Sequence, residues 1–490
     1  MNGADASLTR KLQILLLCVQ PSAGAKTIRD HVDAFGRHSR HRVRVLQNLP
    51  PLYGSFNGRI PTFPRDLDLE IFDVLVIHYS NFLLSDIHFD ASARERIANF
   101  RGLKVLFLQD EYRQVDAICT QIRNLGFDVL FTCVPEAEIE KVYPAAKLPG
   151  LCRISNLTGY VPEDLLRRKA RPLAERPVDV GYRARQVPFW LGNLGAEKWQ
   201  IAPKFLSATS GSGLKCDVTY REEDRLYGKR WIQFFESCRS VLGSESGASI
   251  FDFTGELQQA VERYLAEHPG ATFEEIHERF LKEHEGRVRL NQISPRSFEA
   301  AALRTAMVLY EGEYSGILVP ERHFIPLRKD FSNIDDVVKA IRDTPRLQEM
   351  VDRTYREIAA SGKYSYRSFI DRFDRVVERE ILSRGILSKG KVSAPAALKV
   401  RVASAKFTFS TMGFSAWRKL EPMRTRLKEL VPSEKWIFKM RILVLRIPVF
   451  KFQILDVLLR VGHPIYVRAL PESVRARLRP FVRRILSRGP

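Results

Sequence analysis

The stretch Ser294-Pro-Arg-Ser-Phe-Glu-Ala-Ala-Ala-Leu-Arg-Thr-Ala-Met-Val-Leu-Tyr-Glu311 predicts a short loop, one helix and a strand in immediate succession. Ser294 suits the N-cap of the helix, and Pro295 suits its first position, where the missing N–H costs nothing. The apolar run 306–310 is typical of a strand that is buried in a parallel sheet. The succession predicts an open α/β sheet with this helix packed on it.

Glu299 lies at the start of this predicted helix. The helix dipole stabilises a carboxylate there, and open α/β sheets bind ligands where helix N-termini meet the strand ends. Two explanations stay open at this point. Glu299 is either a carboxylate that binds a ligand or a residue that only compensates the helix dipole.

The Phe-Glu-Ala-Ala-Ala sequence of this helix resembles the C-terminal domain of glycosyltransferases with the GT-B fold, and most closely their bacterial group 1 and spore-maturation-type branch. The resemblance implies that Glu299 hydrogen-bonds the ribose hydroxyls of a nucleotide sugar. The retaining motif of that family has a second glutamate eight residues earlier, where this chain has Asn291. This departure leaves the sugar contact and the stereochemistry of the reaction open.

Strands alternate with helices through residues 1–165, which predicts a first doubly wound parallel sheet. Polar residues follow several of its strand ends, where such sheets meet their ligands. The resemblance implies that the acceptor binds on this domain. We therefore expect His78 or Asp110 to lie at a cleft rim and to act as general base. A structural histidine and a helix-capping aspartate are the alternatives.

A second series of strands and helices over residues 166–383 predicts a second doubly wound sheet, including one helix expected from Lys229 to Val241. Its first strand ends in Arg183 and Arg185, and Lys198 lies on the next helix. By the resemblance, these cations hold the diphosphate of the donor, which two cations beside a helix N-terminus can neutralise without a metal. Solvated surface cations are the alternative.

Polar residues after later strands of this second domain are candidates for contacts with the donor base or sugar. These candidates are Glu245, Ser246, Ser294, Arg296, Ser315 and Gly316. Glu245 and Ser246 lie in a polar loop between apolar segments, which is equally typical of a simple turn. Residues 254–286 predict two acidic, solvated helices inserted before Ser294. Further helices continue through Glu380, and the terminal helix of a GT-B fold returns to the first domain.

The chain has 490 residues and a net charge of +21, which is concentrated in its last part. Residues 384–490 contain 24 Lys and Arg against five acidic residues and so carry 19 of these charges. Apolar side chains are interleaved with the cations over 436–460 and 473–488, as in helices that lie in the plane of a membrane. We expect residues 384–490 to bind an anionic membrane surface. A helix that binds a partner protein is the alternative, and nucleic acid is expected to be an unlikely partner.

The six cysteines are scattered without a C-x-x-C pair, which indicates free thiols in a reducing compartment. No metal site and no cofactor other than a nucleotide-sugar co-substrate are expected. The sequence has no recognisable secretory signal and no uncharged apolar run of about 18 residues. These features predict a cytoplasmic protein, peripheral at the inner face of the plasma membrane.

The residues and the resemblance together imply two Rossmann-like, doubly wound α/β domains of the GT-B type and a basic amphipathic helical tail. The expected divisions are 1–165, 166–383 and 384–490. The implied activity is a hexosyltransferase-like transfer of sugar from a nucleotide sugar to a glycan or lipid-linked acceptor, in polysaccharide or cell-envelope biosynthesis. The alternative is a non-catalytic scaffold that binds sugar nucleotides while docked on a membrane.

Overall fold

The computed structural model describes residues 10–19, 26–47, 63–64, 67–86, 88–386 and 393–402. Two parallel sheets belong to one compact unit, Met1–Phe407. This arrangement confirms the expected α/β class with parallel strands. The three-part division of the chain stays a prediction, and the expected amphipathic helices after residue 402 lie outside the described residues.

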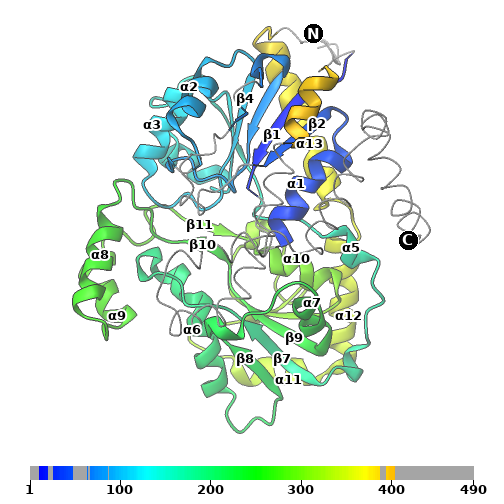
Figure 1. The fold of residues 1–490 in the computed structure, drawn as a ribbon. Helices are drawn as coiled ribbons and strands as arrows, with labels where there is room; N and C mark the ends of the chain where they lie inside the picture. The colour runs from blue at the N-terminus through cyan, green and yellow to red at the C-terminus, as the bar shows by residue number, and fades with distance from the viewer. Residues whose placement is uncertain are drawn as a thin grey trace, which may run out of the picture. The chain divides into compact units, whose positions relative to one another are not determined.

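The first sheet has six parallel strands in the order β2-β1-β3-β4-β5-β6 (Figure 1). The strands are β1 (Gln13–Cys18), β2 (Arg42–Gln47), β3 (Val74–Ile77), β4 (Leu103–Phe107), β5 (Val129–Thr132) and β6 (Cys152–Ser155). Strand β6 was not expected from the sequence. Alternate residues of β1 enter two different cores, because successive side chains of a strand point to opposite faces. Helices therefore cover both faces of the sheet.

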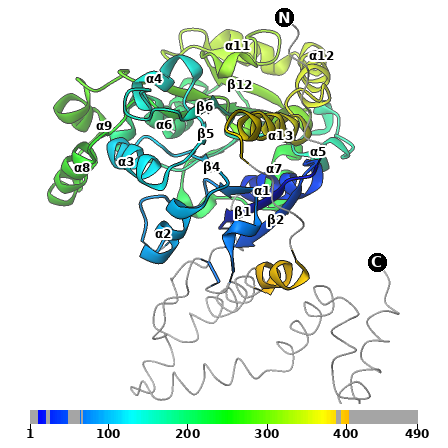
Figure 2. The same ribbon diagram turned by 90° about the horizontal axis from the view of Figure 1, so that it is seen from above.

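Different helices contribute to the cores on the two faces of this sheet. One core packs against α2 (Ala91–Asn99) and α3 (Val115–Leu125), and the other against α1 (Lys26–His38) and α13 (Tyr366–Ser383). Helices α1 and α13 lie side by side (Figure 2). The Arg40 guanidinium donates to the Glu378 carboxylate, and Arg384 just after α13 donates to Asp128 at 2.9 Å. The last long helix thus belongs to the first sheet, although it follows the second in sequence.

The second sheet has five parallel strands in the order β13-β12-β9-β7-β8. The strands are β7 (Val178–Arg183), β8 (Cys216–Thr219), β9 (Cys238–Gly243), β12 (Ala306–Tyr310) and β13 (Ile325–Leu327). One face is covered by α6 (Gly192–Ala208), α11 (Ile334–Arg342) and α12 (Thr344–Thr354). The other face is covered by α7 (Lys229–Ser237) and α10 (Pro295–Ala302). We refer to each sheet with the helices on it as the first and the second lobe.

The predicted helix from Lys229 to Val241 is wrong in its second half. Helix α7 ends at Ser237, and the following residues form the central strand β9. Ser240, Val241 and Leu242 of β9 are all buried, so both faces of the strand are covered. Such a strand has no alternation of polar and apolar residues that would distinguish it from the end of an apolar helix.

The expected insertion contains α8 (Glu256–Glu267) and α9 (Phe273–Ile276). It is not solvated on all sides, because Val261, Phe273 and Ile276 pack with Trp190 in a small core of their own. Beside it, β10 (Ser246–Ala248) and β11 (Leu290–Gln292) form a two-stranded antiparallel ribbon. The insertion therefore supports the loop that leads from β7 to α6.

Candidate functional site

A cavity of about 420 Å³, which we call the central cavity, lies where the strands of the second sheet end. The loops after β7 and β9, the start of α10 and Lys198 of α6 form its walls on the second lobe. Asp110, Tyr112 and Arg113, from the loop after β4, close it from the first lobe. This is the edge at which parallel α/β sheets bind their ligands.

A second cavity of about 260 Å³, the α10 cavity, adjoins the central one. The two share Arg183, Arg185, Trp231, Ser294 and Arg296 among their lining residues. The remaining walls of the α10 cavity are formed by α1 of the first lobe and by Arg225, Tyr227 and Glu299 of the second. An elongated ligand can therefore occupy both cavities across the start of α10.

Helix α10 begins as the sequence predicts. The Ser294 hydroxyl accepts the N–H of Arg296 at 3.4 Å, and Pro295 occupies the first turn. The Thr158 hydroxyl donates to the carbonyl of Ile293 at 2.7 Å, which fixes the approach of the chain to this helix. The start of α10 is consequently held from both lobes.

Glu299 lies in the α10 cavity, where its carboxylate accepts the indole N–H of Trp231 at 2.9 Å. Burial raises the pKa of this carboxyl group, against the hydrogen bond from Trp231 and the positive charge of Arg296. A partly desolvated carboxylate beside an indole ring is chemically suited to accept the hydroxyl groups of a sugar next to an aromatic ring.

Lys198 supplies the most perturbed cation of the central cavity. Its ammonium group donates to the carbonyl of Gly247 at 3.1 Å. Burial lowers the pKa of Lys198 to about 8; Asp110 counteracts this, whereas Arg296 and Arg185 lower it further. The ammonium therefore lies in a partly desolvated position among like charges.

Two arginines complete this cationic wall. Arg185 is exposed, and within the described part of the chain its side chain has no hydrogen bond or ion pair. Arg296 donates to the carbonyl of Arg183 at 2.7 Å, and its guanidinium lies 5.4 Å from the ring of Trp231. Both side chains line both cavities.

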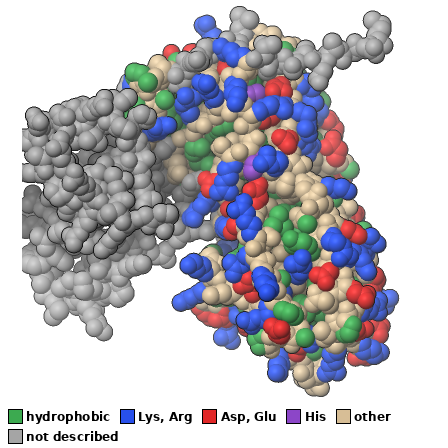
Figure 3. All heavy atoms as spheres, turned by 90° about the vertical axis from the view of Figure 1, so that its right-hand side faces the viewer, with side chains coloured by type: hydrophobic (Ala, Val, Ile, Leu, Met, Phe, Trp, Pro, Cys, Tyr) green, Lys and Arg blue, Asp and Glu red, His purple; other side chains and the backbone are tan. Residues whose placement is uncertain are grey.

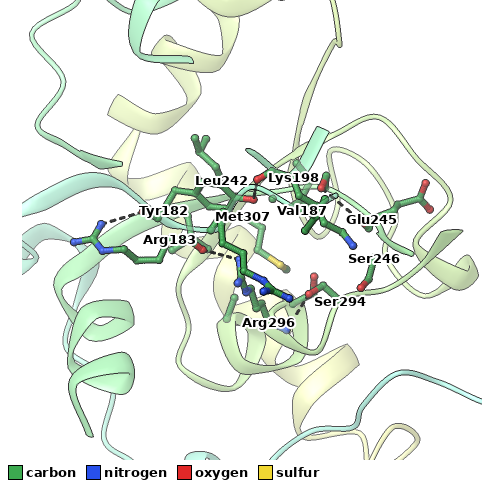
Figure 4. A pocket seen from close by; sticks show the side chains of 18 of the residues that line it. Tyr182, Arg183, Val187, Lys198, Leu242, Glu245, Ser246, Ser294, Arg296 and Met307 are labelled. Carbon is green, nitrogen blue, oxygen red and sulfur yellow. Dashed lines mark hydrogen bonds between the residues drawn. The ribbon is translucent and has the colours of Figure 1, made fainter. Parts of the chain in front are cut away.

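The expectation that Arg183 offers a free cation to the cavity is wrong. Its guanidinium donates to both carboxylate oxygens of Asp217 at 2.8 and 2.9 Å and lies over the ring of Phe234. Figure 4 shows it pointing away from Lys198 and Arg296. Arg183 is the last residue of β7, whereas Arg185 lies beyond the strand end, so residue type alone does not distinguish the two.

Glu245 and Ser246 line the central cavity, but Glu245 has a structural task as well. Its carboxylate accepts the N–H groups of Glu313 and Tyr314 at 3.0 and 2.7 Å. Burial raises its pKa, against these two hydrogen bonds. Glu245 therefore anchors the loop after β12 at the edge of the cavity.

Ser315 and Gly316 lie outside the described cavities, so their expected contact with the sugar is not supported by their position. The Ser315 hydroxyl donates to Gln292 at 2.8 Å and accepts the N–H of Ile293 at 3.0 Å. This loop turns towards β11 because Glu245 holds its preceding residues.

A third cavity of about 590 Å³, the β4 cavity, lies at the strand ends of the first sheet. Asp110 is exposed and lines this cavity as well as the central one, so it lies at a rim as expected. Glu111 beside it is buried and accepts hydrogen bonds from Thr132 and from the N–H of Cys133. Glu111 also lines the β4 cavity, whereas Asp110 lines both this cavity and the central one.

His78 does not lie at a rim, which corrects the prediction. The side chain has no exposed surface, and its two ring nitrogens contact His31 Nδ1 at 3.0 Å and the Ser80 hydroxyl at 2.9 Å. Burial, together with His31, holds its pKa well below the ordinary value. Neither nitrogen is directed to a described cavity, because His78 turns inward between β3 and α1.

Sequence reasoning missed several residues that the fold brings to the site, namely Tyr112, Arg113, Tyr182 and Trp231. Trp231 lies near the start of α7, and no sequence motif around it indicates a binding site. Tyr112 and Arg113 directly follow Asp110, so proximity to that residue was the available signal.

No family model matches the chain, and no curated protein matches it. Among solved structures, it is similar to an alpha-glucosyltransferase in complex with UDP and DNA, at 11% identity and a TM-score of 0.42, over 76% of this chain and 100% of that one. It is also similar to Anabaena HepE in complex with UDP, at 13% identity and a TM-score of 0.39, over 75% and 100% of the two chains. TarM is a further match, at 9% identity and a TM-score of 0.37, over 64% and 56%.

At these identities and TM-scores, the likenesses do not assign an activity. The narrower resemblance to the spore-maturation-type branch stays a prediction. The expectation that nucleic acid is an unlikely partner also stays a prediction. Within the described ranges, no group of three or more His, Cys, Asp or Glu is placed to hold a metal ion, and no helix has the length and apolarity to cross a membrane.

The desolvation of Lys198 predicts that Lys198→Met raises the stability of the protein at neutral pH, by about 1–2 kcal/mol. The free energy gained by removing this buried charge is larger than that lost with the hydrogen bond to Gly247, which is worth about 1 kcal/mol. Below pH 8 the folded and unfolded chains both hold the proton, so the full gain is expected there. The gain in stability should shrink as pH rises from about 8 to the ordinary lysine pKa of about 10.4. In this range Lys198 loses its proton in the folded wild type, whereas the unfolded chain still holds it.

The measurement is the free energy of unfolding in urea at about pH 7 and about pH 9.5. Lys204→Met is the matched control, because Lys204 is an exposed lysine of the same helix. A Lys198→Met variant that is no more stable than this control at the lower pH would contradict the desolvation of Lys198.

Proposed function

We propose that the chain is a GT-B glycosyltransferase that transfers a sugar from a nucleotide-sugar donor to a glycan or lipid-linked acceptor. The observation that carries the proposal is the chemistry of the joined central and α10 cavities. Lys198, Arg185 and Arg296 supply cations, Glu299 supplies a carboxylate, and Trp231 supplies an aromatic ring. A nucleoside diphosphate needs these three kinds of group within one elongated site.

In this proposal, the nucleoside lies in the α10 cavity. Glu299 accepts hydrogen bonds from the ribose hydroxyls, and the base lies near Trp231 or Tyr227, which line the same cavity. The diphosphate crosses the start of α10 and is held by Arg296, Arg185 and Lys198. These cations would stabilise the negative charge that develops on the leaving diphosphate, and their N–H donors are already in place.

Asp110 is the proposed general base. It lines the central cavity and the β4 cavity, so an acceptor in the second can reach a donor in the first. The carboxylate would take the proton of the acceptor hydroxyl while the oxygen forms a bond to the anomeric carbon of the sugar. The bond from that carbon to the diphosphate breaks, and the nucleoside diphosphate leaves with the electron pair.

Replacement of the ribose-binding carboxylate provides the first test. Glu299→Gln keeps the shape of the side chain and removes its charge, so a charge-assisted hydrogen bond of about 1.5–3 kcal/mol is weakened. We expect the Kd for one of UDP, GDP, ADP or TDP to rise by about tenfold or more, by calorimetry. Glu349→Gln, an exposed residue of α12, is the control. A wild-type protein that binds none of the four diphosphates would refute the proposal.

Replacement of Asp110 separates an enzyme from a non-catalytic scaffold. Asp110→Asn should leave the Kd for the nucleoside diphosphate within about twofold and lower transfer, or hydrolysis of the bound donor, by about 10²–10⁴-fold. The readout is the release of nucleoside diphosphate from the donor whose base the first test identifies. A wild type that binds the donor and never releases the diphosphate, with any acceptor or water, would favour the scaffold.

We also propose that residues 384–490 hold the protein, which we infer to be cytoplasmic, on the anionic inner face of the plasma membrane. The net charge of this segment supports the proposal. A second support is the outer surface of α13, which directly precedes it. Arg367, Arg372 and Arg375 are exposed there and form no hydrogen bond or ion pair within the described ranges. Figure 3 views the side of the molecule that carries α1 and α13, and Lys and Arg side chains are widespread on it.

This docking predicts that the full chain sediments with vesicles that contain phosphatidylserine and not with vesicles of phosphatidylcholine alone. Several cations at about 1 kcal/mol each are enough for stable binding, and high salt should weaken it. A DNA duplex of similar charge density is the comparison. Binding to DNA without binding to the anionic vesicles would favour nucleic acid as the partner of these residues.

A further inference from the structure

The loop after β4 connects the two lobes at the site. Among the described lining residues, Asp110 and Arg113 are the two that the central cavity and the β4 cavity share. Asp110 already has a proposed role. Arg113 is a cation on the wall opposite Lys198, Arg185 and Arg296, which all come from the second lobe.

The backbone of this loop is fixed by the segment between β10 and α8. The N–H of Asp252 donates to the carbonyl of Tyr112 at 2.8 Å, and the N–H of Asp116 donates to the carbonyl of Phe253 at 3.0 Å. Arg113 and Asp252 form a parallel bridge between these two bonds. The position of Arg113 is therefore set by main-chain contacts to this segment.

Asp252 does not neutralise Arg113. Its two carboxylate oxygens accept the N–H groups of Gly255 and Gln258, both at 2.8 Å, at the start of α8. The Arg113 guanidinium instead lies 5.6 Å from the ring of Trp190, and its Nε has no hydrogen-bond partner in the described part of the chain. An arginine that stacks on a ring can still present N–H groups of its planar edge to an anion. The Tyr112 hydroxyl is a hydrogen-bonding neighbour of the Arg113 side chain.

We propose that Arg113 is a diphosphate-binding residue contributed by the first lobe, so that the donor diphosphate is held between cations of both lobes. The inference rests on the proposed function and deepens it. Lys198, Arg185 and Arg296 would hold one side of the diphosphate, and the guanidinium of Arg113 the other. Because Asp110 precedes it by three residues, binding of the diphosphate at Arg113 also places the general base next to the reacting sugar.

The test compares ligands with and without phosphate. We take the nucleoside diphosphate that binds the wild type and the nucleoside with the same base, and measure Kd by calorimetry for the wild type, Arg113→Gln, Arg113→Lys and Arg123→Gln. Arg123 is an exposed arginine of α3 that lines none of the cavities. We expect Arg113→Gln to raise the Kd of the diphosphate about tenfold or more and to leave that of the nucleoside within about twofold.

Arg113→Lys should fall between the wild type and Arg113→Gln, because an ammonium lacks the planar edge of a guanidinium. Arg123→Gln should match the wild type. An unchanged Kd for the diphosphate in Arg113→Gln would overturn the role of Arg113 while the proposed function stands. An equal loss for the diphosphate and the nucleoside would also overturn it, since the effect would then be on the shape of the site. A wild type that binds no nucleoside diphosphate would overturn both proposals.

Discussion

The site depends on the burial of a charged group: Lys198 lies desolvated beside Arg185 and Arg296, with Asp110 as an opposing charge. Lys198, Arg185 and Arg296 come from a helix, a strand end and a second helix, and they converge at the carboxyl edge of one parallel sheet. Burial and the neighbouring arginines disfavour the proton on Lys198. Packing of the two lobes must offset this free energy, and an anion that enters the cavity relieves it. The same desolvation that weakens the fold therefore favours the binding of an anion.

Local signals were enough to predict most of the fold. Ser294 and Pro295 have the chemistry of a helix start, and α10 begins there. The alternation of strands and helices over residues 1–165 predicts the first sheet, because parallel strands buried on both faces are continuous in hydrophobicity. The same property explains the error at β9. A buried strand that follows an apolar helix has no pattern to separate the two, and only the pairing of Val241 with Gly181 and Met307 on its two sides defines it as the centre of the sheet.

The site was harder to predict than the fold because the type of a residue does not determine where its side chain points. Arg183 and Arg185 are two residues apart, yet the first is bound to Asp217 and the second is exposed at the cavity. His78 and Asp110 both follow strands of one sheet, yet the first turns into the core beside His31 and the second faces solvent. The Arg183 and His78 side chains are held away from the cavities by hydrogen-bond partners that are distant in sequence, Asp217 and His31. Trp231 and Arg113 could not be assigned at all, since their importance comes from cavities that form only when separate segments meet.

The backbone contact between Tyr112 and Asp252 has a consequence for how such a protein can change over time. Its hydrogen bonds are made by main-chain groups, so the course of the loop after β4 does not depend on which side chains the loop carries. Substitutions at residues 110 to 114 can alter the chemistry presented to both cavities while the loop stays where it is. A scaffold of this kind can acquire a new ligand preference by single substitutions, because the main-chain contacts keep the loop in place.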